Sequence, residues 1–393
     1  MVRAADRVVL GVLGSQIRLG RLEVHLPGGV RRVYRGARPG PEVTLTIRDG
    51  RLLRRLASGG AIGLADGYIA GDLETDDLAG LIELGALHLE PGNRPGLPAT
   101  VERAGRAIWR AVSTSSIPRG PLRDVVEHYD LGNDFYERWL DPSMTYSSAV
   151  FSGPSMSLED AQQEKYRRLA DGAGVGPGDR VLEIGSGWGG FAMHAAGLGA
   201  EVTTVTVSKE QATYVEKLAS ERGVADRIDV RLEDFADTTG TYDRVVSIEM
   251  IESLPARRWP AFMATIRDRL GDDGRAALQI ITVADRHWAS SNANPDFIRR
   301  YVFPGGQVPS PGVLRRLEAE HGLVLRSRAL HGASYARTLR AWRERFDANA
   351  EAIATMGFDE RFRRMWRYYL SYCEGGFRAG RVDVEQLVLT RAG

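Results

Sequence analysis

The segment Val181–Gly190 constrains the fold of this chain more than any other. Its apolar start ends in an acid, Glu183, and the chain then enters a glycine-rich turn that includes Gly185 and Gly187. Glycines adopt positive φ angles and leave no Cβ in the way of a ligand. Residues 191–196 then have the composition of a helix. A strand, a glycine loop and a helix in this order hold a nucleotide-like ligand above the carboxyl ends of parallel strands.

The spacing of the acid and the glycines narrows the kind of ligand. The pattern E-x-G-x-G-x-G differs from the G-x-G-x-x-G of dinucleotide enzymes, and it lacks the G-K-[ST] ending of a phosphate-binding loop. It resembles motif I of S-adenosylmethionine (SAM) methyltransferases. An ordinary glycine-rich turn is the alternative interpretation, and the strand and helix patterns that follow disfavour it.

Strand and helix patterns alternate beyond residue 170. Strands are expected at 180–184, 201–207, 228–232, 244–248 and 276–283, and helices at 211–220 and 259–270. This alternation predicts an α/β fold with a doubly wound, mostly parallel sheet and helices on both faces. We expect a Rossmann-like, seven-stranded sheet of the class I SAM methyltransferase type, with a last strand at 384–390 as its antiparallel edge.

The 393 residues are enough for two domains. Residues 1–90 predict a small α+β domain, with strands at 16–24 and 42–48 and helices at 51–57 and 78–87. A linker rich in proline and glycine follows, and residues 101–112 predict a basic amphipathic helix, so 91–112 form the connection. That helix suits either a peripheral membrane anchor or packing against the next domain. The methyltransferase domain is expected over 113–393.

Charge is unevenly distributed along the chain. The net charge is +1, which argues against nucleic acid as the main partner. Residues 1–60, however, hold 12 arginines and 4 acids, a balance of +8. This excess predicts a basic surface that meets something anionic, such as a membrane, although a solvated face is the alternative.

The single cysteine, Cys373, excludes an intrachain disulfide and a cysteine-based zinc site, and we expect no metal. No stretch approaches the roughly 18 apolar residues of a membrane span. Together these features predict a cytoplasmic protein that is peripheral at the inner face of the membrane.

The glycine loop and the second strand supply the expected cofactor contacts. Glu183 and the backbone of Gly185 and Gly187 are expected to lie against the amino-acid end of SAM. The second strand ends without the acid that usually binds ribose hydroxyls. The hydrogen bonds there are instead expected from the segment that includes Thr206, Val207 and Gln211.

A second group of polar and aromatic residues precedes the glycine loop. Residues 127–151, here called the lid segment, mix His, Tyr, Asn and Ser with apolar residues, which favours a lid over the cofactor. The motifs HYDLGNDFY, DPSMTYSSAVF, VLEIGSGWGG, VTVSKEQ, SIEMIES, RYVFPGGQVPS and GASYARTLRAW occur in that order. With them the chain resembles, over essentially its whole length, the cyclopropane-fatty-acyl-phospholipid synthase and mycolic acid cyclopropane synthase family.

The resemblance implies methyl transfer from SAM to a carbon of a cis double bond in a phospholipid acyl chain, which leaves a carbocation. A base, implied to be a bound bicarbonate, then removes a proton from the new methyl group and a cyclopropane ring closes. By motif position, Tyr146 and Ser147 are implied to contact SAM, and His128 to lie near the site. The implied bicarbonate-binding residues are Ser148, Glu252, Gln279 and Tyr335.

The chemistry itself favours an apolar, aromatic pocket. An alkene needs proximity to the methyl donor and a place for positive charge, and aromatic faces supply the latter. The aromatic candidates are Tyr146, Phe151, Trp188, Tyr301, Phe303 and Tyr335.

Two positions depart from the best-known members of the family, which have Cys in place of Ser148 and His in place of Gln279. Both substitutes can donate hydrogen bonds, but Gln cannot carry a proton between groups. A methylene branch, made into a methyl branch such as a 10-methyl fatty acid by a partner reductase, is therefore the alternative product. The sequence also leaves open a non-catalytic lipid-binding protein and a small-molecule methyltransferase. The resemblance favours a homodimer.

Overall fold

The computed structural model describes residues 10–11, 14, 16–88, 131–293 and 296–392. The chain divides into two compact units that are each built from separated stretches. The first unit takes residues 1–130, 293–304 and 343–381, and the second takes 131–292, 305–342 and 382–393. The expected helix at 101–112 and His128 lie outside the described residues.

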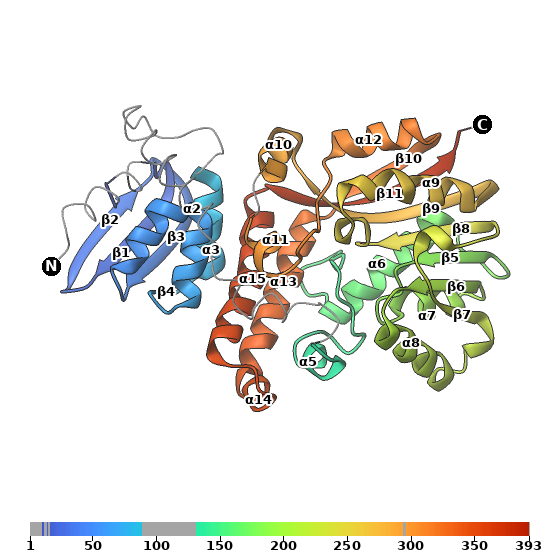
Figure 1. Cartoon of the computed structure of the whole chain (residues 1–393), viewed down its shortest axis with the longest axis horizontal. Coiled ribbons are helices and arrows are strands. Elements are labelled where there is room, and N and C mark those ends of the chain that lie inside the picture. The colour runs from blue at the N-terminus through green and yellow to red at the C-terminus, as the bar shows by residue number, and fades with distance from the viewer. Residues whose placement is uncertain (1–9, 12–13, 15, 89–130, 294–295, 393) are drawn as a thin grey trace. The chain divides into compact units, whose positions relative to one another are not determined.

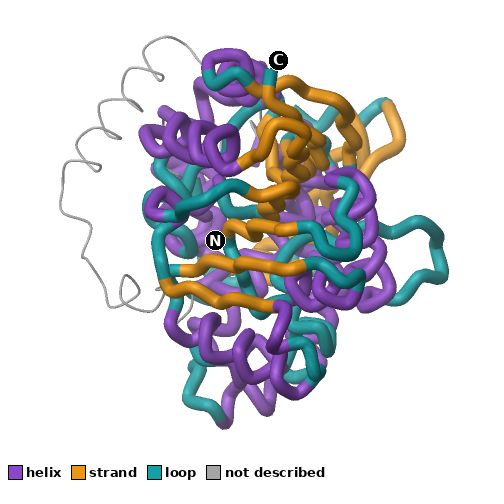
Figure 2. The backbone as a smooth tube through the Cα atoms, turned by 90° about the vertical axis from the view of Figure 1, so that its right-hand side faces the viewer, coloured by secondary structure: helices purple, strands orange, loops and turns teal. Residues whose placement is uncertain are grey.

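The second unit is built on a seven-stranded sheet, which confirms the expected fold class (Figure 1). Its strands are β5 (Arg180–Ile184), β6 (Glu201–Thr206), β7 (Ile228–Leu232), β8 (Tyr242–Ile248), β9 (Leu270–Val283), β10 (Leu323–Leu330) and β11 (Val382–Arg391). They lie in the order β10-β11-β9-β8-β5-β6-β7. Six of these seven strands run in one direction, and β11 runs in the opposite direction, antiparallel to both β9 and β10. Figure 2 shows these strands side by side.

The last strand does not form the edge, contrary to the sequence-based expectation. It lies between β9 and β10, a strand that the sequence analysis did not identify. The burial of the two strands explains the order. Residues 384–387 of β11 are all buried, as a strand covered on both faces requires, whereas most of β10 is exposed, as is usual at an edge.

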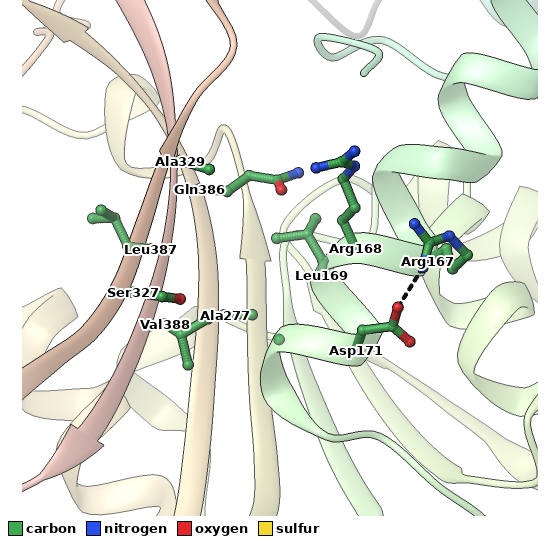
Figure 3. Close-up of a pocket in the computed structure, with 11 residues that line it drawn as sticks. Arg167, Arg168, Leu169, Asp171, Ala277, Ser327, Ala329, Gln386, Leu387 and Val388 are labelled. Atoms are coloured by element: carbon green, nitrogen blue, oxygen red, sulfur yellow. Dashed lines mark hydrogen bonds and ion pairs between the residues drawn. The ribbon is translucent and has the colours of Figure 1, made fainter. Parts of the chain in front are cut away.

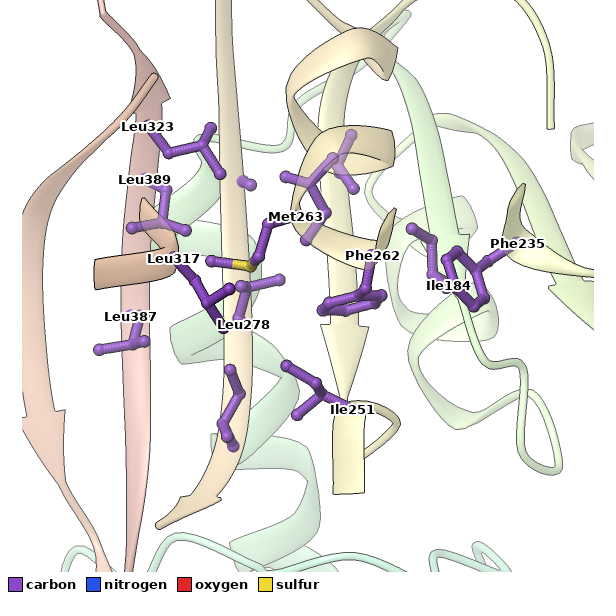
Figure 4. Packing of buried hydrophobic residues seen from close by; sticks show 14 of the residues in the cluster. Ile184, Phe235, Ile251, Phe262, Met263, Leu278, Leu317, Leu323, Leu387 and Leu389 are labelled. Atoms are coloured by element: carbon purple, nitrogen blue, oxygen red, sulfur yellow. The ribbon is translucent and has the colours of Figure 1, made fainter. Parts of the chain in front are cut away.

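Helices cover both faces of the sheet. Because side chains alternate along a strand, Val181 of β5 packs toward α6 (Leu158–Ala173) and α7 (Gly190–Gly197), while Leu182 and Ile184 face the other way. On that other face lie α9 (Trp259–Arg269) and α12 (Pro311–Glu320). Figure 4 shows Phe262 and Met263 of α9 packed over this face. The helix α8 (Lys209–Glu221) packs beside β7.

The first unit contains a four-stranded sheet in the order β2-β1-β3-β4. Its elements are β1 (Leu19–Leu26), β2 (Val30–Arg35), β3 (Arg38–Ile47), α2 (Arg51–Ile69), β4 (Leu73–Thr75) and α3 (Leu78–His88). The small α+β arrangement matches the expectation for these residues, although α2 is longer than expected and β2 and β4 were not identified.

The first unit also takes helices from later in the chain. These are α11 (Phe297–Tyr301), α14 (Ala350–Thr355) and α15 (Glu360–Arg378). The helix α15 packs on α3 so closely that a Cβ at Gly375 would lie 2.7 Å from the backbone oxygen of Ala79. Arg364 of α15 donates to the backbone oxygen of Tyr68 at 2.6 Å. The unit therefore extends beyond the 1–90 boundary expected from composition, because α2 and α3 bury their apolar faces against a distant helix.

Candidate functional site

The glycine loop connects β5 to α7 at the carboxyl end of the sheet. Gly185, Gly187 and Gly189 have φ angles of +94°, +49° and +83°, which residues with a Cβ rarely adopt. The N–H of Gly185 donates to the backbone oxygen of Val205 on β6 at 3.0 Å, so this group is engaged within the sheet. A Cβ built at Gly187 would meet nothing within 4 Å, so the loop leaves room for a ligand at that residue. This room fits the expected approach of SAM.

Glu183 points to the α6 side of the sheet and is buried. Its Oε2 accepts a 2.6 Å hydrogen bond from the hydroxyl of Thr204. Burial raises its pKa to about 8, against the opposing effects of Thr204 and of Lys165 on α6. A carboxyl group held in this way at the end of β5 suits the ammonium group of SAM, because a ligand cation would compensate for the burial of its charge.

The expected ribose-binding residues meet at the end of β6. The hydroxyl of Thr206 donates to Oε1 of Gln211 at 2.7 Å and accepts from the N–H of Ser208 at 3.1 Å. Ser208 in turn caps α8, where its hydroxyl accepts from the N–H of Gln211. Val207 between them is 73% exposed. Thr206, Ser208 and Gln211 are thus linked by hydrogen bonds beside the exposed side chain of Val207. They lie at the end of β6, the strand next to β5 and its glycine loop.

The lid segment is described from residue 131, where it forms the short helix α5 (Asn133–Glu137) and then a buried loop. The indole N–H of Trp188, inside the glycine loop, donates to Oδ1 of Asn133 at 2.8 Å. Trp188 also contacts the ring of Tyr136, with centroids 4.9 Å apart. The lid segment is therefore anchored on the glycine loop itself.

An aromatic cluster joins the lid segment to the helix α13 (Gly332–Ala348). Its members, which touch with ring centroids between 4.9 and 6.0 Å apart, are Tyr136, Trp139, Tyr146, Trp188, Tyr335 and Trp342. Three of the aromatic candidates from the sequence belong to it, and three do not. Arg337 stacks on the ring of Phe151 at 3.8 Å, while Tyr301 and Phe303 belong to the first unit.

Ser147 is held by a lysine that the sequence analysis did not single out. Nζ of Lys165 donates to the Ser147 hydroxyl at 2.6 Å, and Gln162 donates to the Ser147 backbone oxygen at 3.0 Å. Lys165 is fully buried, and burial lowers its pKa to about 7, although Glu249, Asp141 and Glu183 oppose that shift. The signal was present in the composition, since the chain has only three lysines among 52 basic residues.

Three of the four residues implied to bind bicarbonate converge on Glu249. Its Oε1 accepts from the backbone N–H of Ser148 at 2.7 Å and from Nε2 of Gln279 at 2.8 Å. Its Oε2 accepts from the hydroxyl of Tyr335 at 2.8 Å. The Ser148 hydroxyl is turned away and donates to the backbone oxygen of Ala149. Sequence reasoning missed Glu249, although SIEMIES contains it as well as Glu252.

The amide of Gln279 is fixed by neighbouring groups. Its Oε1 accepts from Nε2 of Gln386 on β11 at 2.9 Å, while its Nε2 also donates to the backbone oxygen of Ser148 at 3.0 Å. Gln386 lines a surface depression next to Arg168 of α6 (Figure 3). The depression is thus separated from Glu249 by two glutamine side chains, and it holds none of the expected cofactor residues.

Glu249 has a backbone conformation that is uncommon for a residue with a side chain. It follows β8 with a φ of +50°, and its N–H donates to the backbone oxygen of Gln279 at 2.8 Å. Met144 is the one other non-glycine residue with positive φ among the described residues. Such strain persists where the surrounding structure enforces it, and it is concentrated at functional sites.

Glu252 lies one turn further along, in a 3₁₀ turn (Ile251–Ser253). Its Oε1 accepts from the N–H of Ile281, and its buried Oε2 has no hydrogen-bond partner among the described residues. Burial and the neighbouring Glu249 raise its pKa to about 8. Glu252 therefore shares a buried region with Glu249 but none of the three donors that were expected beside it.

The family model and the individual relatives that match this chain agree with one another. A family model described as mycolic acid cyclopropane synthetase matches residues 118–387. The tuberculostearic acid methyltransferase UfaA1 of Mycobacterium tuberculosis is 35% identical, over 95% of this chain and 90% of its own. The cyclopropane-fatty-acyl-phospholipid synthase of Escherichia coli strain K12 is 34% identical, over 88% of this chain and 87% of its own.

The comparison with solved structures agrees with these sequence matches. The cyclopropane synthase MmaA2 of Mycobacterium tuberculosis matches with a TM-score of 0.63 and 34% identity, over 68% of this chain and 97% of that chain. The mycolic acid cyclopropane synthase CmaA1, complexed with SAH and CTAB, matches with a TM-score of 0.63 and 30% identity, over the same shares.

Proposed function

The chain belongs to the mycolic acid cyclopropane synthetase family of SAM-dependent methyltransferases, and we propose that it methylates the cis double bond of unsaturated phospholipid acyl chains. The observation that carries this proposal is the convergence of Ser148, Gln279 and Tyr335 on one buried carboxylate, next to an aromatic cluster and the glycine loop. A small-molecule nucleophile such as an amine would need no such apolar surroundings.

When bound, SAM supplies an electrophilic methyl group on a positively charged sulfur. The chain's own residues supply position and electrostatics. The glycine loop leaves space at Gly187, and the aromatic cluster offers ring faces that stabilise positive charge on the acyl chain. Because the lid segment is bonded to the glycine loop through Trp188 and Asn133, it can exclude water from a carbocation that water would capture.

The product is proposed to be a cyclopropane ring. A specific observation favours a second candidate, a methylene-bearing chain that a partner reductase would convert to a methyl branch. The relative with 95% coverage of this chain is named for tuberculostearic acid, and Gln279 lacks the proton-carrying capacity of the His in the best-known members. Both products require loss of a proton from the transferred methyl group.

Action on phospholipids at the inner face of a membrane is supported by the basic first 60 residues and by β2. This edge strand exposes Val30 and Val33, each 40% accessible, among Arg32 and Arg35. Apolar side chains set among arginines suit an anionic lipid surface. No helix within the described ranges has the length and apolarity to cross a bilayer. A homodimer is also proposed.

Mass spectrometry of fatty acids tests the proposal. Purified protein is incubated with SAM and vesicles of a mono-unsaturated phospholipid, and the fatty acids are then released. We expect a mass gain of one CH₂, and NMR of the product distinguishes a ring from a methylene group. If a folded protein with measured SAM binding leaves every unsaturated phospholipid unchanged, the proposal fails.

A further inference from the structure

We propose that the carboxylate of Glu249 is the base that removes the proton from the transferred methyl group, in the place of a bound bicarbonate. The inference rests on the proposed function, and it concerns a residue that the family resemblance did not point to. It makes the base part of the polypeptide.

The hydrogen-bond donors support this assignment first. A bicarbonate at this site would need the donors on Ser148, Gln279 and Tyr335, and all three already donate to the two oxygens of Glu249 at 2.7–2.8 Å. The Ser148 hydroxyl faces Ala149, so it adds no further donor. A second anion would have to break these bonds and leave Glu249 buried without them, which is unfavourable. The residues present therefore do not fit bicarbonate.

The charges around Glu249 also support its assignment as the base. The surroundings of Glu249 already hold the carboxyl group of Glu252, and the two groups interact unfavourably when charged. Lys165 is a buried cation that acts on Glu249, and it also acts on Asp141 and Glu183. A bicarbonate would add a negative charge to a region where three acidic side chains already interact with this one ammonium group. One carboxylate at the position of Glu249 matches that balance better than a carboxylate and an anion together.

The backbone conformation of Glu249 also supports its assignment as the base. A φ of +50° at Glu249 is a conformation that glycine adopts freely and glutamate does not. The strained conformation places the carboxylate against donors from three distant parts of the chain, at residues 148, 279 and 335. A glycine here would relieve the strain, so a carboxylate kept at this cost is expected to have a chemical role.

The π electrons of the alkene form a bond to the methyl carbon, while the electrons of the breaking sulfur–carbon bond stay on sulfur, and the acyl chain becomes a carbocation. Glu249 then takes a proton from the new methyl group. The electrons of that C–H bond close the third side of the ring, or, after a hydride shift, form the methylene double bond. Glu249 is left neutral, and its proton passes to solvent after the product leaves.

Three variants and one probe test the inference. We expect wild-type turnover to be the same in carbonate-free buffer and with added bicarbonate. Glu249→Gln, which keeps the size of the side chain, should lose about 100-fold or more in turnover while SAM affinity changes little. Glu249→Gly, which also relieves the strain, should be inactive until bicarbonate is added and then recover in part. Glu221→Gln, at an exposed end of α8, is the matched control and should behave as wild type.

Carbon-13 NMR of labelled bicarbonate gives a readout that is independent of turnover. The wild type should leave the bicarbonate signal unchanged, and Glu249→Gly should broaden or shift it. Bicarbonate-dependent wild-type turnover, bicarbonate binding by the wild type, or full activity of Glu249→Gln would each overturn the inference. Absence of methyl transfer by the wild type would instead count against the proposed function, while the NMR result still decides the assignment of Glu249.

Discussion

The hydroxyl of Tyr335 donates to Oε2 of Glu249 at 2.8 Å, across 86 positions of sequence. This bond joins the aromatic cluster to the buried carboxylate, since Tyr335 also contacts Trp342 with ring centroids 6.0 Å apart. Tyr335 therefore belongs to the aromatic cluster, which suits a carbocation, and is also bonded to the carboxylate that suits removal of the proton.

Removal of that hydroxyl tests its effect on Glu249. Burial raises the pKa of Glu249, and the bond from Tyr335 opposes the shift. Tyr335→Phe should therefore raise the pKa further, so the acidic limb of the turnover profile should move to higher pH. We expect about tenfold lower turnover near neutral pH, with partial recovery at alkaline pH. A profile that loses height without moving would contradict this role for the hydroxyl.

Lys165 offers a second test through charge. It is a buried cation that lowers the pKa of Glu249, and it also holds the Ser147 hydroxyl. Lys165→Met should weaken turnover by roughly tenfold or more near neutral pH, because Glu249 then keeps its proton more strongly. Lys217→Met is the matched control, since that lysine is 75% exposed. Steady-state assays of the two variants check the prediction, and equal losses would refute it.

The raised pKa of Glu252 predicts that the stability of the folded protein depends on pH. Its pKa of about 8 in the folded state lies above the ordinary 4.5, so between these values the folded state holds a proton that the unfolded state lacks. Its contribution to stability therefore falls as the pH rises through this window. Glu252→Gln removes the group that titrates. Compared with the wild type, the variant should gain thermal stability at about pH 8 relative to about pH 5. Thermal melts at the two pH values measure the gain.

A double substitution tests whether the two kinds of base can be exchanged. Glu249→Gly removes the carboxylate, and Gln279→His restores the residue found in the best-known members of the family. We expect Glu249→Gly/Gln279→His to respond more strongly to added bicarbonate than Glu249→Gly alone. The single Gln279→His variant should remain independent of bicarbonate, because Glu249 still takes the donors. Turnover against bicarbonate concentration separates the three proteins.

The exposed arginines of β2 test contact with membranes. Arg32→Glu/Arg35→Glu should weaken binding to anionic vesicles and reduce its dependence on salt, with SAM affinity unchanged. The full chain is required, because deleting residues 1–90 would uncover the face of α15 that packs on α2 and α3. Vesicle sedimentation at two salt concentrations is the measurement. Equal binding by the variant and the wild type would argue against this surface.

The sequence predicted those parts of the fold that depend on local pattern. The strands from β5 to β9 carry apolar runs or alternating apolar residues, and Val181–Gly190 has a characteristic spacing, so both were found. Three of the eight residues of the edge strand β10 are polar, and its place beside β11 depends on long-range pairing, which no local pattern records.

The residues of the candidate site were likewise predicted only in part. Ser148, Gln279 and Tyr335 were named from motifs, and the structure brings them together. Glu249 was missed because motif position pointed to the second acid of SIEMIES, whereas burial, a left-handed backbone and three converging donors can be seen only in three dimensions. Lys165 was missed because one helical lysine is usually exposed.

The packing of α15 on α2 and α3 bears on how the protein is synthesised. The helices α2 and α3 leave the ribosome long before α15, the helix that covers their apolar faces. Domains usually fold as they emerge, beginning with the N-terminal one. Here the first unit cannot be completed until α15 has been made, so α2 and α3 are expected to need protection by chaperones during translation.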